Sequence, residues 1–179
     1  RDSIQGDPHH TMGNFYGDRF GSAIARAGDV DGDGHEDLIA GAFYGSYVKV
    51  FSGFNGAPIH HFTRAAAPPV QYGLAVGSTS DIDGDTFPEL LIVGAGGGSD
   101  SKAFVLEIRS GRSGDLLYQL DGSQVPLEQS DIAVYSFGDA VIGLGDIDGD
   151  GKGDFAISGK VERMSSIGYT GRVLSLIHI

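Results

Sequence analysis

Short apolar runs separated by turn residues recur along the chain, and no segment has the 3.6-residue spacing of an amphipathic helix. In the first part of the chain we predict strands over residues 23–27, 38–43, 47–51 and 59–62, with Gly, Asp, Asn and Ser between them. The run YVKVF suits a partly solvated strand, whereas LIAGAF and LLIVGA are near-continuous apolar runs that suit strands buried on both faces. The pattern predicts an all-β protein.

This pattern occurs three times. The three copies read RFGSAIARAGDVDGDGHEDLIAGAF, QYGLAVGSTSDIDGDTFPELLIVGAG and SFGDAVIGLGDIDGDGKGDFAISGK. In each copy an aromatic residue followed by glycine stands nine residues before the first aspartate of an acidic loop; the pairs are Phe20-Gly21, Tyr72-Gly73 and Phe137-Gly138. Further on, VFSGFNGAPIHHF aligns with IRSGRSGDLLYQL without a gap. Four short antiparallel strands in a repeat of roughly 40–50 residues or more are typical of a β-propeller blade, whose apolar faces are buried only by neighbouring blades.

The repeats predict how the chain is divided. We expect blades over residues 15–64, 65–129 and 130–173, the third of them incomplete, after a segment 1–14 that is an N-terminal segment or the end of a preceding blade. The last six residues, LSLIHI (174–179), resemble the translated read-through of a sequencing adaptor, so we expect a non-native tail there. Propellers need at least about four blades. We therefore expect a fragment of a larger ring, with neighbouring blades of the same or another chain.

The amino-acid composition of the chain excludes some classes of binding partner. Acidic residues outnumber basic ones by 24 to 12, and the formal net charge is −12. Such a surface repels nucleic acid and anionic lipid and favours cations. No apolar run approaches the roughly 18 residues of a membrane span, so we expect no membrane insertion. The chain has no cysteine, which excludes a disulfide framework.

Half of the acidic residues, 12 of 24, recur at the same positions of three repeated loops. The loop DVDGDGHED starts at Asp29, and its carboxylates at loop positions 1, 3, 5 and 9 recur at the same spacing in the other two loops. With a main-chain carbonyl at position 7, this spacing matches the preference of Ca²⁺ for six to eight oxygen ligands. The predicted ligands are the side chains of Asp29, Asp31, Asp33, Asp37, Asp81, Asp83, Asp85, Glu89, Asp146, Asp148, Asp150 and Asp154, and the carbonyl groups of His35, Phe87 and Lys152. We expect up to three Ca²⁺ ions, one per repeat.

The loops and the histidines are open to three other interpretations. An EF-hand needs a glutamate at position 12 and flanking helices, but position 12 is Ala40, Ile92 or Ile157. Asp-Gly clusters can also form plain hairpin turns, yet three loops with one ligand pattern favour a cation. The histidine pairs His9-His10 and His60-His61 are poor transition-metal sites, because adjacent strand residues face opposite sides.

The second loop departs most from the pattern. It has Thr86 where the other loops have glycine, Pro88 nearby, and the longer Glu89 as its last carboxylate. We therefore expect it to bind its cation more weakly than the other two.

A Phe-Gly pair, a D-x-D-G-D-G-x-x-D loop and an apolar strand ending in Gly-Ala together resemble the FG-GAP repeat. The cues are Phe20-Gly21 with Gly41-Ala42, and Tyr72-Gly73 with Gly94-Ala95; Phe137-Gly138 pairs with the degenerate Ser158-Gly159. That repeat builds the β-propeller head of integrin α-subunits and of many bacterial secreted or surface proteins. The resemblance implies rings of about seven blades, structural Ca²⁺ in the hairpin between the first two strands of each blade, and an extracellular, secreted or cell-surface location.

The function expected from this resemblance is an adhesion or ligand-binding scaffold, with an unknown protein or carbohydrate as its ligand. The chain has no G-x-S-x-G, P-loop, H-E-x-x-H or cysteine nucleophile, so we predict no catalytic and no organic-cofactor residues and no enzyme activity. The alternatives are a part of a secreted Ca²⁺-dependent enzyme acting on polysaccharide or phospholipid, or a carbohydrate-binding module. Phe43, Tyr44, Tyr47 and Tyr169 could line a ligand surface, but packing roles are favoured for each.

Overall fold

The structure is a computed structural model that describes residues 17–64, 70–96, 104–121, 132–163 and 169–176. Among these residues every regular element is a β-strand, so the predicted all-β class is confirmed. The strands are β1 (Phe20–Gly28), β2 (Asp37–Ala42), β3 (Tyr47–Phe51), β4 (Pro58–Thr63), β5 (Val70–Thr79), β6 (Glu89–Gly96), β7 (Phe104–Ser110), β8 (Leu116–Asp121), β9 (Ile132–Gly145), β10 (Asp154–Arg163) and β11 (Tyr169–Leu176). The described part of the chain has no helix long and apolar enough to cross a membrane.

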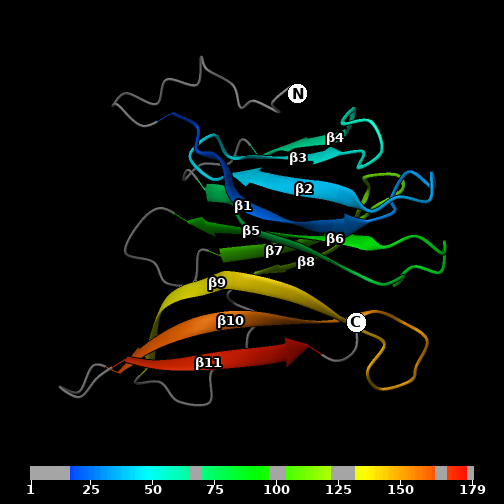
Figure 1. The fold of residues 1–179 in the computed structure, drawn as a ribbon. Coiled ribbons are helices and arrows are strands. Elements are labelled where there is room, and N and C mark those ends of the chain that lie inside the picture. Colours follow the sequence, from blue (N-terminus) through cyan, green and yellow to red (C-terminus); the bar gives the residue numbers. More distant parts are fainter. Residues whose placement is uncertain (1–16, 65–69, 97–103, 122–131, 164–168, 177–179) are drawn as a thin grey trace.

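The strands form three antiparallel sheets that lie one above another (Figure 1). Two sheets have four strands in sequence order, β1-β2-β3-β4 and β5-β6-β7-β8, and the third has the order β11-β10-β9. The four strands predicted over residues 23–62 are confirmed, with ends that differ by up to three residues. These sheets have the strand order expected of propeller blades. The blade boundaries remain predictions. Segment 1–14 and residues 177–179 lie outside the described residues, while β11 carries residues 174–176.

The apolar core lies between the sheets. One cluster joins Ile39, Val48 and Val50 of the first sheet to Val76 and Ile92 of the second. A second cluster joins other side chains of the second sheet to the third sheet; it contains Leu91, Val93, Leu106, Phe155 and Ile157. Successive residues of β6 thus alternate between the two clusters, which confirms that the run LLIVGA is buried on both faces. A single sheet could not bury these side chains by itself.

Strand β3 is more buried than its sequence predicts. Of its five residues only Lys49 is half-exposed; the prediction of a partly solvated strand was therefore wrong. Tyr47 stacks on the Phe20 ring with centroids 5.9 Å apart, and the Lys49 Nζ lies 5.6 Å from the centroid of Phe20. The lysine stem covers aromatic surface while its ammonium stays near solvent, so one charged residue does not mark a solvated strand.

The repeated glycines explain how the sheets approach each other so closely. Gly73, of the aromatic-glycine pair in β5, has φ 83° and lies at a register shift between β5 and β6. A Cβ atom on Gly41 of β2 would lie 2.2 Å from the Gly73 carbonyl oxygen. Gly138 of the third sheet has φ 87°, and a Cβ there would lie 2.3 Å from Cγ1 of Val93. The aromatic-glycine pair of one sheet thus packs directly on the sheet before it, and only glycine leaves room for that contact.

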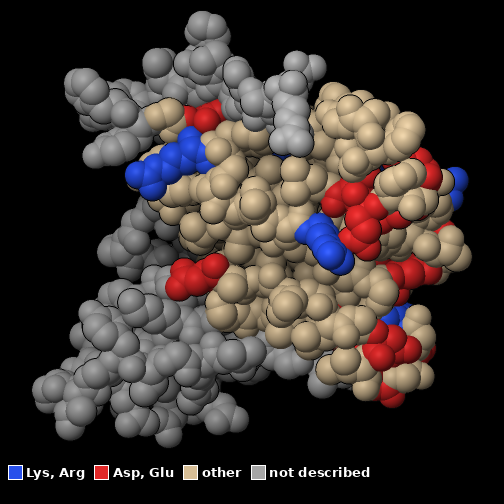
Figure 2. All heavy atoms as spheres, viewed as in Figure 1, with Lys and Arg blue, Asp and Glu red and all other residues tan. Residues whose placement is uncertain are grey.

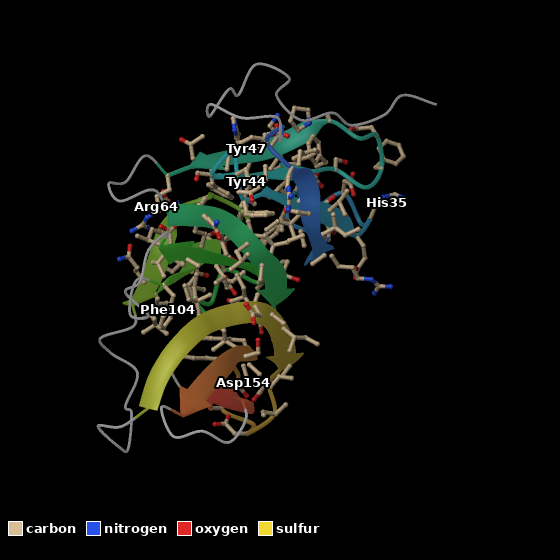
Figure 3. The ribbon with its side chains drawn as sticks, turned by 90° about the vertical axis from the view of Figure 1, so that its left-hand side faces the viewer. His35, Tyr44, Tyr47, Arg64, Phe104 and Asp154 are labelled. Carbon is tan, nitrogen blue, oxygen red and sulfur yellow. The ribbon has the colours of Figure 1, made fainter. Side chains whose placement is uncertain are left out.

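A buried ionic group also joins the first two sheets. Glu107 of β7 is only 3% exposed; it accepts hydrogen bonds from the Tyr72 hydroxyl (2.7 Å) and from Arg109 Nε (2.8 Å). Arg64, which follows β4, donates from Nη1 to the same carboxylate, and Figure 3 shows it beside the second sheet. Burial raises the pKa of Tyr72 and the nearby Glu107 raises it further, so the phenol stays protonated and can donate.

We expect Gly41→Ala to destabilise the fold by about 2–3 kcal/mol, because its methyl group collides with backbone that cannot rotate away. Urea unfolding of the variant and of Gly17→Ala measures this cost; a methyl group on Gly17 meets no atom within 4 Å, so that control should stay within about 0.5 kcal/mol of the parent. Equal stabilities of the two variants would contradict close packing of β2 on β5.

Tyr72→Phe removes one hydrogen bond to a buried carboxylate and should cost about 1.5–3 kcal/mol in the same assay. Tyr118→Phe on β8 is the matched control, because Tyr118 is 36% exposed; it should cost less than about 0.5 kcal/mol. A neutral Tyr72→Phe would show that the hydrogen bond from Tyr72 to the buried Glu107 carboxylate does not stabilise the fold.

Candidate metal centre

The three acidic loops lie at one edge of the stacked sheets. Each loop joins the first two strands of its sheet: β1 to β2, β5 to β6 and β9 to β10 (Figure 1). Figure 2 shows acidic side chains gathered along the same edge. The sheets repeat in one orientation, so equivalent hairpins meet on the same side and their negative charges accumulate there.

One hydrogen-bond pattern shapes all three loops. The position-1 aspartate accepts the N–H groups of positions 4 and 6; in the first loop Asp29 accepts those of Gly32 (2.8 Å) and Gly34 (2.9 Å). The equivalent bonds to Asp81 are 2.6 and 2.8 Å, and those to Asp146 are 2.7 and 3.0 Å. The position-3 carboxylate accepts the N–H of position 5 in every loop. These bonds curl the backbone around its own carboxylates.

Positions 4 and 6 need a left-handed backbone for this curl. At position 6 the φ angle is 86° at Gly34, 74° at Thr86 and 89° at Gly151. Glycine adopts this conformation freely, whereas β-branched threonine is strained in it. The second loop therefore keeps the shape of the others at a conformational cost.

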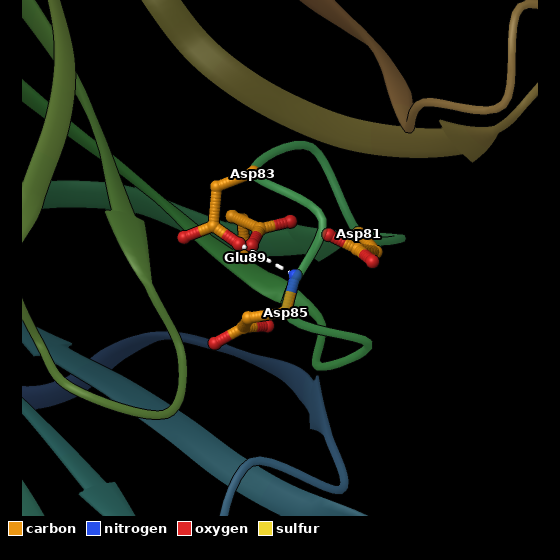
Figure 4. A group of neighbouring side chains, drawn as sticks. All are labelled: Asp81, Asp83, Asp85 and Glu89. Carbon is orange, nitrogen blue, oxygen red and sulfur yellow. Dashed lines mark hydrogen bonds between the residues drawn. The ribbon is translucent and has the colours of Figure 1, made fainter.

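The structure brings most of the predicted carboxylates together. In the second loop Asp81, Asp83, Asp85 and Glu89 can each offer one oxygen, with these oxygens all within 4.8 Å of one another (Figure 4). The same criterion joins two smaller sets, which are Asp29, Asp31 and Asp33 in the first loop and Asp146, Asp148 and Asp154 in the third. A set of converging carboxylate oxygens suits a hard divalent cation such as Ca²⁺.

Two of the predicted carboxylate ligands, Asp37 and Asp150, fall outside these sets. Asp37 accepts the N–H of Val30 (2.8 Å) and that of Gly53 (2.9 Å) through its two oxygens. Asp150 accepts the N–H of Lys152 (2.9 Å). The N–H groups of His35 and Phe87 likewise donate to their position-5 aspartates, at 2.8 Å in both loops. Coordination by the position-7 carbonyl groups stays a prediction.

Glu89 is the most unusual of the candidate ligands. It is fully buried, its Oε2 accepts the N–H of Ile82 (2.7 Å), and its Oε1 has no hydrogen-bond partner. Burial raises the pKa of Glu89 to about 8; the Ile82 N–H lowers it, whereas Asp83, Asp81 and Asp85 raise it. A buried carboxylate surrounded by three others lacks a positive partner among the described residues, so the donor set fits a cation.

Sequence reasoning missed the turn between the third and fourth strands as part of this centre. The Ser52 hydroxyl lies 3.4 Å from Asp33 Oδ2, and the His35 and Phe54 ring centroids are 5.0 Å apart. In the second sheet, Arg112 lies 4.4 Å from the Phe87 ring centroid. The Ser-Gly pair repeated in VFSGFNG and IRSGRSG was the available signal, because the same pair recurs directly after the third predicted strand of both repeats.

The histidines do not form a metal site within the described residues. His60 Nε2 lies 2.6 Å from the Gly111 carbonyl oxygen, while His61 packs edge-on against Tyr47. The two rings thus have partners on different sides of β4, as predicted. Burial, together with the charge of Lys49, lowers the pKa of His61. His9 and His10 lie outside the described residues.

The antiparallel β-sheet repeats, each with an acidic loop in its first hairpin, are similar to FG-GAP-type propeller repeats. No family model matches the chain. Curated relatives are integrin α-subunits: integrin alpha-V of Gallus gallus is 30% identical over 83% of this chain, and integrin alpha-5 of Xenopus laevis is 35% identical over 54%. Integrin alpha-PS2 of Drosophila melanogaster is 30% identical over 58% of the chain. The resemblance to integrin α-subunits is confirmed, although the chain spans only 8–15% of the length of these relatives.

Thr86→Gly should stabilise the protein by about 0.5–1 kcal/mol, because it relieves a β-branched residue at φ 74°. Thermal unfolding measures the gain. Thr63→Gly, in an ordinary strand position of β4, is the matched control and should lose about 0.5–1 kcal/mol. Loss of stability in both variants would show that Thr86 is not strained.

Proposed function

We propose that this chain is part of an extracellular or cell-surface β-propeller that serves as an adhesion or ligand-binding scaffold, with Ca²⁺ stiffening one hairpin of each blade. The observation that carries the metal assignment is the convergence of carboxylate oxygens in all three loops, with a buried, unpartnered oxygen of Glu89 in the second. The similarity to integrin α-subunits supports the scaffold role. The ligand would be a protein or a carbohydrate, and no catalytic step is assigned.

The role of the ion follows from charge. The twelve predicted carboxylate ligands are half of the acidic residues of a chain whose formal charge is −12. Like charges this close repel one another. A bound dication attracts every carboxylate of its loop, so the net electrostatic interaction within the loop becomes favourable. Three bound ions would bring the formal charge to about −6. Here the ions would hold the loops in shape and would not take part in chemistry, because the carboxylates that bind them also brace the loop backbone.

Calcium should raise the melting temperature of the protein, and a chelator should reverse the rise. A ligand at about 100 times its dissociation constant adds roughly 2.7 kcal/mol per site. Asp31→Asn should reduce this increment, since Asp31 belongs to the carboxylate set of the first loop. Glu36→Gln is the control within the same loop; its exposed carboxylate lies 3.6 Å from Arg26 and outside that set, so the increment should stay unchanged. A melting temperature indifferent to Ca²⁺ and chelator would exclude the metal role.

The scaffold role is tested separately, by binding to arrays of extracellular proteins and of glycans. Binding that requires Ca²⁺ and is lost in the loop variants supports a Ca²⁺-stiffened adhesion module. Glycan binding that survives mutation of the loops would instead indicate a carbohydrate-binding module.

A further inference from the structure

The last carboxylate of each loop has one oxygen with a fixed role. In all three loops that oxygen accepts the N–H of position 2, at 2.8 Å for Asp37, 2.7 Å for Glu89 and 2.8 Å for Asp154. This bond closes the loop onto the strand that follows it. The loops differ in what happens to the second oxygen.

In the first loop the second oxygen is already used. The N–H of Gly53, in the turn after β3, donates to Asp37 Oδ1 at 2.9 Å. The equivalent N–H in the second sheet belongs to Gly111, and it donates to the carbonyl oxygen of Pro88 at 3.2 Å. Glu89 Oε1 is thereby left without a partner although its residue is fully buried.

A buried carboxylate oxygen without a partner is costly, and a cation can satisfy it. Glu89 belongs to the group of converging carboxylates in the second loop, whereas Asp37 does not belong to the corresponding group in the first loop. The second loop is thus the one in which all four carboxylates converge. We propose, on the premise that the loops bind Ca²⁺, that the second loop is the highest-affinity site of the three and that Glu89 is the residue that makes it so.

This order is the reverse of the one expected from the loop sequences. The carbonyl oxygen of Pro88 accepts the N–H of Gly111, whereas the equivalent N–H of Gly53 binds the last carboxylate of the first loop. Thr86 keeps the left-handed backbone, and its N–H still reaches Asp81 Oδ2 at 2.8 Å. Neither departure opens the loop. Glutamate also carries one more methylene than aspartate, which lets it anchor one oxygen and extend the other towards the aspartates.

The test is a calorimetric titration of the chain with Ca²⁺, combined with melting in chelator. Glu89→Gln should weaken the tightest binding step about tenfold or more, because it removes a charged ligand. In chelator the same variant should melt close to the parent temperature, because the carbonyl oxygen of a glutamine can still accept the Ile82 N–H. A substitution that merely damaged the fold would lower both the Ca²⁺ affinity and the melting temperature in chelator.

Asp37→Asn is the matched variant in the first loop. It should leave the tightest step unchanged but lower the melting temperature in chelator, because an amide cannot accept both backbone N–H groups that Asp37 now binds. Glu89→Asp gives the second loop the aspartate of the other two and should also weaken the tightest step; it serves if Glu89→Gln fails to fold.

The outcomes separate this inference from the proposed function. A parent chain that binds no Ca²⁺ contradicts the proposed function itself. A parent chain that binds Ca²⁺, but whose tightest step survives Glu89→Gln and Glu89→Asp or is lost in Asp37→Asn, overturns only the assignment of the highest affinity to the second loop.

Discussion

Direct backbone contact between neighbouring sheets is the constraint on which the rest of this structure depends. The Gly73 carbonyl oxygen sits where a Cβ of Gly41 would have to be, and Gly138 is equally close to Val93. At that separation the apolar strand β6 contributes to two cores at once. The short sheets therefore share their hydrophobic burial, and each is stable only beside its neighbours.

The same stacking concentrates negative charge. Since every sheet has one orientation, its first hairpin and acidic loop reach the same edge (Figure 2). Backbone N–H groups hold the carboxylates in place within each loop, so the oxygens cannot simply turn away to solvent. Close packing of sheets and a requirement for a cation are thus linked, because one repeat supplies both the glycine contact and the loop.

The two interfaces between sheets are not interchangeable. Two hydrogen bonds join the second and third sheets. Gly153 donates its N–H to the Asp81 carbonyl oxygen at 2.9 Å. The Thr79 hydroxyl donates to the Asp154 carbonyl oxygen at 2.7 Å. Between the first and second sheets the residue equivalent to Gly153 is Pro88, which has no N–H; a Cβ on Gly28 would lie 2.6 Å from its Cγ. The buried Glu107 group bridges these sheets instead. A single loop position can therefore affect both the metal site of its loop and the contact between two sheets.

The sequence by itself determined the repeat, the strands, the buried character of β6 and the acidic loops, because these depend on local period, turn residues and fixed spacing. It did not reveal that Lys49 lies over aromatic rings, that Glu107 is buried among Tyr72 and two arginines, or that Ser52 and Phe54 contact the first loop. Only the tertiary structure decided which carboxylates converge. The second oxygens of Asp37 and Glu89 differ because Gly53 and Gly111, each distant in sequence, donate to different acceptors, and no local pattern encodes that choice.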